Sequence, residues 1–211
     1  MHKLSKLRQL GFSLREVLYL QAVQLICSKL ITMRFILAIA FISLLSSGCA
    51  QQMVFGDNAK IYLVRHAEKG QGDDPLLTEG GNKRAGDLLR TLKNRNIRRI
   101  YVTEYKRTQN TGDSLRIQLS IDTVHYIADT TGEDLAKKIT EHHDVNAVIL
   151  VIGHSNTIPK IIQRLALPGY PRDYIADKEF DNLFLLQFKT GKPSLERMKY
   201  GSSSGSSATM Q

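Results

Sequence analysis

Cysteine is absent from most of this sequence. The only two, Cys27 and Cys49, precede the region whose composition is that of a folded domain, so no disulfide framework can hold that domain together. With 42% hydrophobic and 23% charged residues over 211 positions, one ordinary core can form without disulfides or structural metals. The absence of cysteine after residue 49 suits a reducing or an oxidising compartment, and the length suits one domain plus extensions.

A clustered basic face is also missing. The formal net charge is +9, but residues 1–48 hold six Lys/Arg and one acid, which leaves 23 basic against 19 acidic residues, or +4, for the remainder. Nucleic-acid binding needs a basic cluster or a recognition motif, and neither is found. The mild positive excess is compatible with an anionic small-molecule substrate, and no nucleic-acid partner is expected.

Long hydrophobic runs are absent as well. The longest stretch, residues 35–45, has eleven uncharged residues, which is too short to cross a bilayer comfortably but suits a signal peptide. Small residues and Cys49 follow it, and this resembles a bacterial lipoprotein signal in which Cys49 is lipidated and becomes the first residue. We therefore expect a lipid-anchored protein of the cell envelope, with Met33 as a candidate true start. Ordinary secretion and a buried N-terminal helix are the alternatives.

The rest of the chain alternates between β-branched apolar runs and helical periodicity, which predicts a three-layer α/β/α fold with a mostly parallel sheet. The predicted strands are 60–64, 99–103, 121–128 and 147–152, the helices are 78–93, 106–115, 132–143 and 157–165, and a terminal hairpin pairs 181–189 with 194–200. The resulting organisation is a leader (1–48), a linker (49–58), the domain (59–200) and a flexible Ser/Gly tail (201–211).

Charged residues and histidines gather where these strands end. Arg65 and His66 end the first strand, Arg107 follows the second, Asp129 follows the third, and His154 ends the fourth. Ligands bind beyond the carboxyl ends of the strands in open parallel sheets. Each residue alone has an ordinary explanation, but their convergence on one edge predicts a site there.

Four ordered motifs carry a family resemblance. Residues 63–69 read Leu-Val-Arg-His-Ala-Glu-Lys, residues 77–81 Leu-Thr-Glu-Gly-Gly, residues 105–111 Tyr-Lys-Arg-Thr-Gln-Asn-Thr, and residues 151–155 Val-Ile-Gly-His-Ser. Together they resemble the histidine phosphatase (phosphoglycerate mutase-like) superfamily, and most closely the short branch that includes phosphohistidine phosphatases. The resemblance implies a phosphatase that works through a phosphohistidine intermediate on His66.

The residue types suit that chemistry. Phosphoryl transfer depends on positioning and on stabilising negative charge over the equatorial oxygens. Arg65 and Arg107 can donate paired hydrogen bonds to phosphate, His154 can donate another, and Ser155 can add a hydroxyl on the phosphate side. The same positive surroundings disfavour protonation of His66 and keep a ring nitrogen free to attack. We expect a small phosphorylated substrate and no metal or cofactor.

The proton donor for the leaving group is less well defined. Asp129 is the first candidate because it lies at a strand end on the expected edge. Glu133 is the second, although Thr130 and Glu133 also have the spacing of a helix capping box, and Glu104 is the third. Gly72 stands where mutase-like members often have Asn, which argues against sugar-phosphate mutase activity.

Two other functions remain open. Residues 153–157, Gly-His-Ser-Asn-Thr, resemble a nucleophile elbow with Ser155 as the nucleophile of a serine hydrolase, although no histidine follows Ser155. The second alternative is a catalytically weak, envelope-anchored module that only binds a phosphate ligand. The remaining histidines, His125 and His142-His143, have no spacing that completes a metal-ligand set. The sequence specifies neither the physiological substrate nor the oligomeric state.

Overall fold

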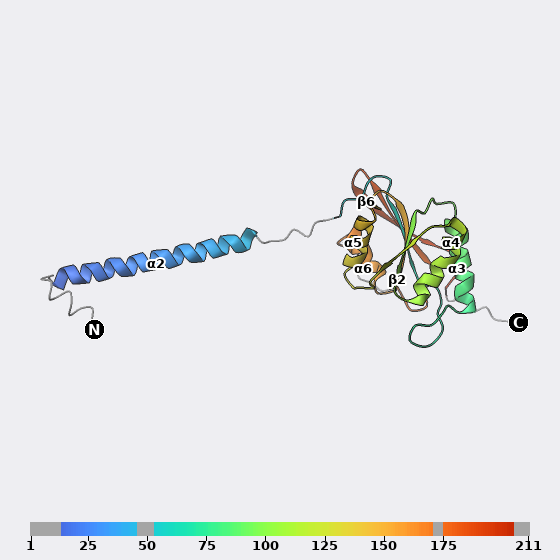
Figure 1. Cartoon of the computed structure of the whole chain (residues 1–211), viewed down its shortest axis with the longest axis horizontal. Helices are drawn as coiled ribbons and strands as arrows, with labels where there is room; N and C mark the ends of the chain where they lie inside the picture. Colours follow the sequence, from blue (N-terminus) through green and yellow to red (C-terminus); the bar gives the residue numbers. More distant parts are fainter. Residues whose placement is uncertain (1–13, 46–52, 171–174, 205–211) are drawn as a thin grey trace. The chain divides into compact units, whose positions relative to one another are not determined.

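The computed structural model describes residues 14–45, 53–170 and 175–204, and the chain divides into two compact units, residues 1–51 and 52–211 (Figure 1). The first unit contains one 32-residue helix, α2 (Leu14–Leu45). Within this unit, its side chains from residue 22 to residue 35 are exposed. None of the helices in the described ranges is both long enough and apolar enough to span a bilayer. Cys49 lies outside the described residues.

The second unit is built on a six-stranded sheet with the order β3-β2-β4-β1-β5-β6. Its strands are β1 (Lys60–Arg65), β2 (Arg99–Thr103), β3 (Thr123–Tyr126), β4 (Val148–Gly153), β5 (Asn182–Lys189) and β6 (Lys192–Lys199). Strands β3, β2, β4 and β1 run parallel, while β5 and β6 are antiparallel to their neighbours. The fold class predicted from the sequence is confirmed.

Helices cover both faces of the sheet, as Figure 1 shows. α3 (Glu79–Leu92) and α4 (Lys106–Leu119) pack side by side on one face, and α5 (Glu133–Glu141) and α6 (Ile158–Leu165) on the other. Helical spacing places Leu88 and Leu92 of α3 in the buried hydrophobic cluster on one face of the sheet. It places Leu135 and Ile139 of α5 in the cluster on the other face. Strand β4 is continuously apolar because it contributes side chains to both layers.

The capping-box interpretation of Thr130 and Glu133 is wrong. Gly132, with a φ of 71°, is the N-cap of α5, and the backbone N–H of Glu133 donates to Thr131 Oγ1 rather than to Thr130. The third strand is also shorter than predicted, because Asp129 and Thr131 already form the turn that leads into α5. The hairpin turn needs only Thr190 and Gly191, whose φ angles of 50° and 70° suit a two-residue turn.

The Ser/Gly tail begins later than the sequence suggested. Ser204 Oγ accepts hydrogen bonds from the backbone N–H groups of Phe180 and Asp181, and the Ser204 N–H donates to Asp181 Oδ2. The carbonyl of Ser202 accepts from Arg84. Residues 201–204 therefore belong to the folded unit.

Candidate active site

The parallel pairing of β1 with β4 brings the two site histidines together. Arg65 lies opposite Gly153 in the register, and the His66 N–H donates to the Gly153 carbonyl over 2.9 Å. The next residue on each strand is then a histidine, and the ring centroids of His66 and His154 lie 5.4 Å apart at 61°. Both residues are buried, at 4% and 8% exposure. The two imidazoles thus lie side by side at the carboxyl ends of the central strands.

A local hydrogen bond assigns the tautomer of His66. Its Nδ1 lies 2.8 Å from the carbonyl oxygen of Ala67, and because a carbonyl only accepts, Nδ1 must carry the hydrogen. The lone pair is therefore on Nε2. Burial lowers the pKa of His66 to about 3, with smaller contributions from His154, Arg65 and Arg107, while the Ala67 hydrogen bond opposes the shift. At neutral pH this imidazole is therefore unprotonated and carries a free lone pair on Nε2.

His154 is held by two threonines that the sequence analysis did not single out. Its Nε2 lies 3.1 Å from Thr103 Oγ1, and its backbone N–H donates to Thr157 Oγ1 over 3.0 Å. Burial, with smaller contributions from Arg107 and Arg65, lowers its pKa to about 4. His154 is thus neutral in the free protein and can donate one N–H to a bound phosphate.

Arg65 is fixed by a loop more than a hundred residues later. Its Nη1 donates to the carbonyls of Ala176 and Asp177 over 3.0 and 2.9 Å, and its guanidinium lies 4.1 Å from the Phe180 ring centroid. Burial lowers its pKa. Because Nη1 is already occupied, the fork onto phosphate predicted from the sequence is restricted to the remaining N–H groups. Its Nε is buried and, among the described residues, has no acceptor.

Arg107, at the start of α4, is arranged in a similar way. Its guanidinium lies 4.0 Å from the Tyr105 ring centroid, and its Nη1 lies 3.8 Å from Asp74 Oδ1. Its Nε is likewise buried with no acceptor in the described part of the chain. Buried donors are normally satisfied, so two unpaired guanidinium N–H groups beside two imidazoles suit an anion.

Each arginine is paired with one aromatic ring, and each ring lies near one histidine. Tyr105 contacts His154 edge-on with centroids 5.4 Å apart, and Phe180 lies 6.1 Å from His66. Tyr105 was part of a quoted motif but was given no role, whereas Phe180 had no sequence signal. Stacking on an aromatic face holds a guanidinium plane in a fixed orientation.

The proposed proton donors do not fit the expected role. Asp129 caps α5: its Oδ1 accepts from Thr131 N over 2.7 Å and also from Gly132 N, and its Oδ2 accepts from Asp134 N over 3.1 Å. Burial raises the pKa of Asp129, but these hydrogen bonds together outweigh it and lower the pKa below its usual value. An ionised, fully bonded carboxylate is a poor acid.

Glu133 and Glu104 are both exposed, and neither carboxylate has a described contact with the histidines. The carboxylate that does contact a site arginine is Asp74, whose Oδ1 also accepts from the backbone N–H of Lys106 over 3.0 Å. No sequence signal predicted Asp74 as a site residue, because it lies in a loop with no motif of its own.

Glu68, the acid in the Arg-His-Ala-Glu-Lys motif, has a structural role. Both of its oxygens accept from Arg84 Nε at 2.9 Å, and Oε1 also accepts from Nη2 at 2.7 Å. Arg84 is buried and donates in addition to the carbonyls of Tyr200 and Ser202. Through Arg84, the loop after β1 is therefore joined to α3 and to residues 200–202.

The serine hydrolase alternative finds no triad. In the described structure the side chain of Ser155 makes no hydrogen bond, and the Nε2 of neighbouring His154 is bonded to Thr103 instead. Ser155 is half-buried beside the site, which is compatible with the hydroxyl role first expected for it. His125 is exposed on β3. No cluster of three or more metal-ligating side chains is found within the described residues.

Comparison with known proteins gives one partial family match and several structures of the same fold. Residues 61–129 match the family model of the histidine phosphatase superfamily (branch 1), while no curated protein matches the sequence. A protein assigned as the phosphohistidine phosphatase SixA of Agrobacterium tumefaciens is similar in structure, with a TM-score of 0.51 and 18% identity over 69% of this chain and 100% of that one.

Two further structures share the fold. The mycobacterial glucosyl-3-phosphoglycerate phosphatase, solved with VO3, has a TM-score of 0.53 and 12% identity over 67% of this chain and 99% of its own. The α-ribazole phosphatase of Shigella flexneri has a TM-score of 0.50 and 13% identity over 66% of this chain and 96% of its own. These structures share the fold that was predicted from the sequence, which is confirmed, and the match over residues 61–129 supports the predicted similarity to the histidine phosphatase superfamily and its phosphatases.

Proposed function

We propose that this protein hydrolyses phosphomonoesters or a phosphoramidate, without a metal, through a phosphohistidine intermediate on His66. The observation that carries the proposal is the Nδ1–H of His66 bonded to the Ala67 carbonyl, which leaves Nε2 unprotonated beside the ring of His154. The unpaired Nε groups of Arg65 and Arg107 supply donors for the phosphoryl oxygens.

In the first step the lone pair on His66 Nε2 forms a bond to phosphorus while the bond from phosphorus to the leaving oxygen or nitrogen breaks. The leaving atom keeps that electron pair and is protonated. In the second step water attacks phosphorus, the N–P bond breaks, and its electron pair returns to Nε2. One proton of that water stays on the phosphate and the other replaces the proton that the leaving atom took up in the first step, so each turnover converts one substrate and one water into an alcohol or amine and phosphate.

Leaving-group protonation limits the substrates. Both oxygens of Asp129 accept hydrogen bonds in the α5 cap, so we infer that the favoured substrate has a leaving group that needs little acid help, such as a phosphoramidate or an aryl phosphate. General acid catalysis typically contributes about 10²–10⁴-fold. We expect kcat/KM for p-nitrophenyl phosphate or phosphoramidate to exceed that for glycerol phosphate by about 10²-fold.

The decisive experiment is a rapid quench with labelled phosphoramidate or p-nitrophenyl phosphate. An alkali-stable, acid-labile phosphoenzyme should map to the peptide containing His66 and be absent from the His66→Ala variant. His125→Ala, which changes an exposed histidine on β3, is the matched control and should label normally. Label on Ser155 or on an aspartate would overturn the mechanism. Phosphate binding without label or turnover would favour the non-catalytic binding module.

Vanadate gives a second measurement. Because the mycobacterial relative was solved with VO3, we expect vanadate to occupy the same cavity here and to inhibit competitively. The Arg107→Leu variant should weaken this inhibition by about 10²-fold, since it removes a charged donor to the oxyanion. Lys106→Leu, which changes the neighbouring exposed cation, should leave it within about twofold.

We also propose that the enzyme works in the cell envelope, anchored through a lipid on Cys49. The support is the apolar run of residues 35–45 followed by small residues and cysteine, with the domain beginning shortly afterwards. Metabolic labelling with palmitate tests it: Cys49→Ser should abolish the label, and Cys27→Ser, at the only other cysteine, should retain it. The anchor proposal would be overturned if the Cys49→Ser variant kept the label, or if the unaltered protein took up no label.

A further inference from the structure

One edge of the sheet, opposite the histidines, gathers features that catalysis does not use. We call it the amino edge, because the parallel strands begin there, and it comprises residues 53–60, 93–98 and 189–192. Hydrogen bonds join these segments to the start of the sheet: Lys60 N to Ala147 O over 3.1 Å, Arg98 N to Val148 O over 2.8 Å, and Gly191 N to Asp57 Oδ1 over 3.4 Å.

The amino edge is rich in unpaired cations. Five exposed side chains on it form no ion pair with any other described residue: Lys60, Lys93, Arg95, Lys189 and Lys192. Lys189 and Lys192 are directly opposite in the β5–β6 register, an arrangement that is destabilising for like charges unless an anion is near. The exposed carboxylate among these segments is Asp57.

The opposite edge, which holds the histidines, carries surface charges of both signs, including the exposed Lys69, Lys106 and Lys178. Its exposed or half-buried carboxylates include Asp73, Asp74, Glu104, Glu133 and Asp177. A six-residue strand such as β1 separates the two edges by about 20 Å, which exceeds the Debye length of about 8 Å at physiological salt. The carboxylates of the histidine edge therefore do not offset the cations of the amino edge.

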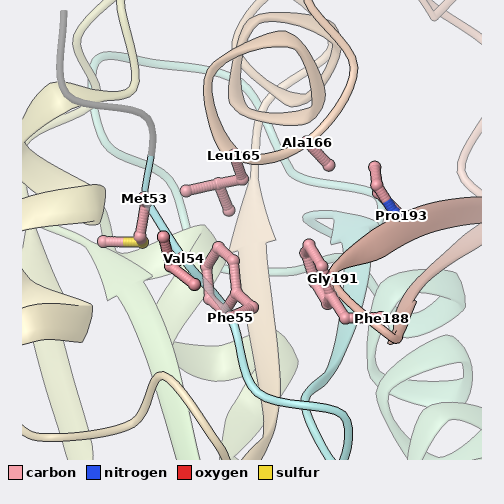
Figure 2. Close-up of a pocket in the computed structure, with 8 residues that line it drawn as sticks. All are labelled: Met53, Val54, Phe55, Leu165, Ala166, Phe188, Gly191 and Pro193. Atoms are coloured by element: carbon pink, nitrogen blue, oxygen red, sulfur yellow. The ribbon is translucent and has the colours of Figure 1, made fainter.

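The amino edge also carries apolar surface. A hollow of about 190 Å³ lies between the entering chain, the end of α6 and the β5–β6 turn, lined by Phe55, Leu165 and Phe188 among others (Figure 2). Phe55 stacks on Phe188 with centroids 4.4 Å apart, whereas Val54 beside it is 81% exposed. Exposed apolar groups next to cations are typical of surfaces that meet a bilayer interface.

We propose that the amino edge is a membrane-contact face for a bilayer with anionic headgroups, and that it holds the histidine edge toward the solvent. The chain enters the folded unit at this face a few residues after Cys49, so the inference rests on the lipid anchor proposed above, which would bring a bilayer within reach of this face. Strands about 4.8 Å apart place Lys60 on β1 and Lys192 on β6 about 10 Å from each other along this edge. Anionic lipid attracts such a group of cations. This inference does not depend on the phosphatase mechanism.

Lysine footprinting tests the proposal, because both edges carry exposed lysines. The protein as cells produce it is reconstituted into vesicles of phosphatidylcholine alone or with about 30% phosphatidylglycerol, acetylated briefly, and mapped by mass spectrometry. Lys60, Lys93 and Lys189 should be protected at least about threefold in the anionic vesicles, and about 0.5 M NaCl should remove the protection. Lys106 and Lys178, at the histidine edge, should react equally in both vesicles.

A paired variant adds a control. Lys93→Gln with Arg95→Gln should reduce the protection of Lys60 and Lys189 at unchanged p-nitrophenyl phosphate turnover, while Lys178→Gln should not. Equal labelling of both edges, or protection of the histidine edge instead, would overturn the proposal. Protection by a short duplex DNA equal to that by anionic vesicles would identify the face as a general polyanion surface and would also overturn it.

Discussion

Gly81 provides a sharp test of how the site is supported. It lies in the first turn of α3, where a methyl group on its Cα would overlap the carbonyl oxygen of Glu68 and lie 3.1 Å from both the carbonyl carbon of Glu68 and Leu77 Cβ. Carbon atoms pack at about 3.5–4.0 Å, so the loop that follows His66 would have to move by about 0.5–1 Å.

The size of the effect follows from two opposing contributions. Overpacking against backbone typically costs about 1–3 kcal/mol, and the upper value applies because the obstacle is a carbonyl rather than a flexible side chain. Replacing a helical glycine by alanine stabilises the folded state by about 1 kcal/mol. Gly81→Ala should therefore lower the free energy of unfolding by about 2 kcal/mol and the melting temperature by about 4–8 °C.

The neighbouring glycine is the matched control. A methyl group on Gly80 would meet only Thr78 Oγ1, at an ordinary 3.7 Å, so Gly80→Ala should stabilise the protein by about 0.5–1 kcal/mol. Urea denaturation of the three proteins measures the difference. Displacing Glu68 also moves the segment beginning at His66, so kcat should fall by about tenfold or more in Gly81→Ala only. Equal stability of the two alanine variants would refute the reasoning.

Three further predictions follow from the site. Because the native pKa values of His66 and His154 are lowered to about 3 and about 4, the unfolded chain binds more protons below pH 6.5. Unfolding free energy should thus fall as the pH drops from about 6.5 to about 4, by up to about 1.4 kcal/mol per unit for each histidine, and a pH series with His66→Asn should show a smaller slope. Arg84→Met should cost about 2–3 kcal/mol in urea denaturation, because it leaves Glu68 without its partner, whereas Lys83→Met at the adjacent exposed pair should cost under about 0.5 kcal/mol. Ser204→Ala should raise KM several-fold, about three- to tenfold, by loosening the segment that places Phe180 on Arg65; Ser202→Ala should not, since Ser202 contributes its backbone carbonyl.

Much of the architecture could be predicted because it is written in local patterns. Continuous apolar runs at 60–64 and 147–152 predict buried parallel strands, and helical spacing at Ala85, Leu88 and Leu92 predicts α3. The carboxyl ends of parallel strands share one edge of a sheet, so the approach of His66 to His154 followed from the same patterns. The boundaries of β3 and α5 were less accurate, because Asp129 and Thr131 hydrogen-bond to nearby backbone and form a turn instead of extending the strand.

The sequence by itself determined the order of the elements, the family and the edge at which the site lies, since these depend on periodicity and on short motifs. Tertiary structure alone decided what each polar group does there. In the folded protein Arg65 donates to the carbonyls of residues 176 and 177, and Glu68 accepts from Arg84. Both carboxylate oxygens of Asp129 accept hydrogen bonds in the cap of α5. A hydrogen bond depends on distances of a few tenths of an ångström between groups that can be a hundred residues apart, and no local pattern encodes such distances.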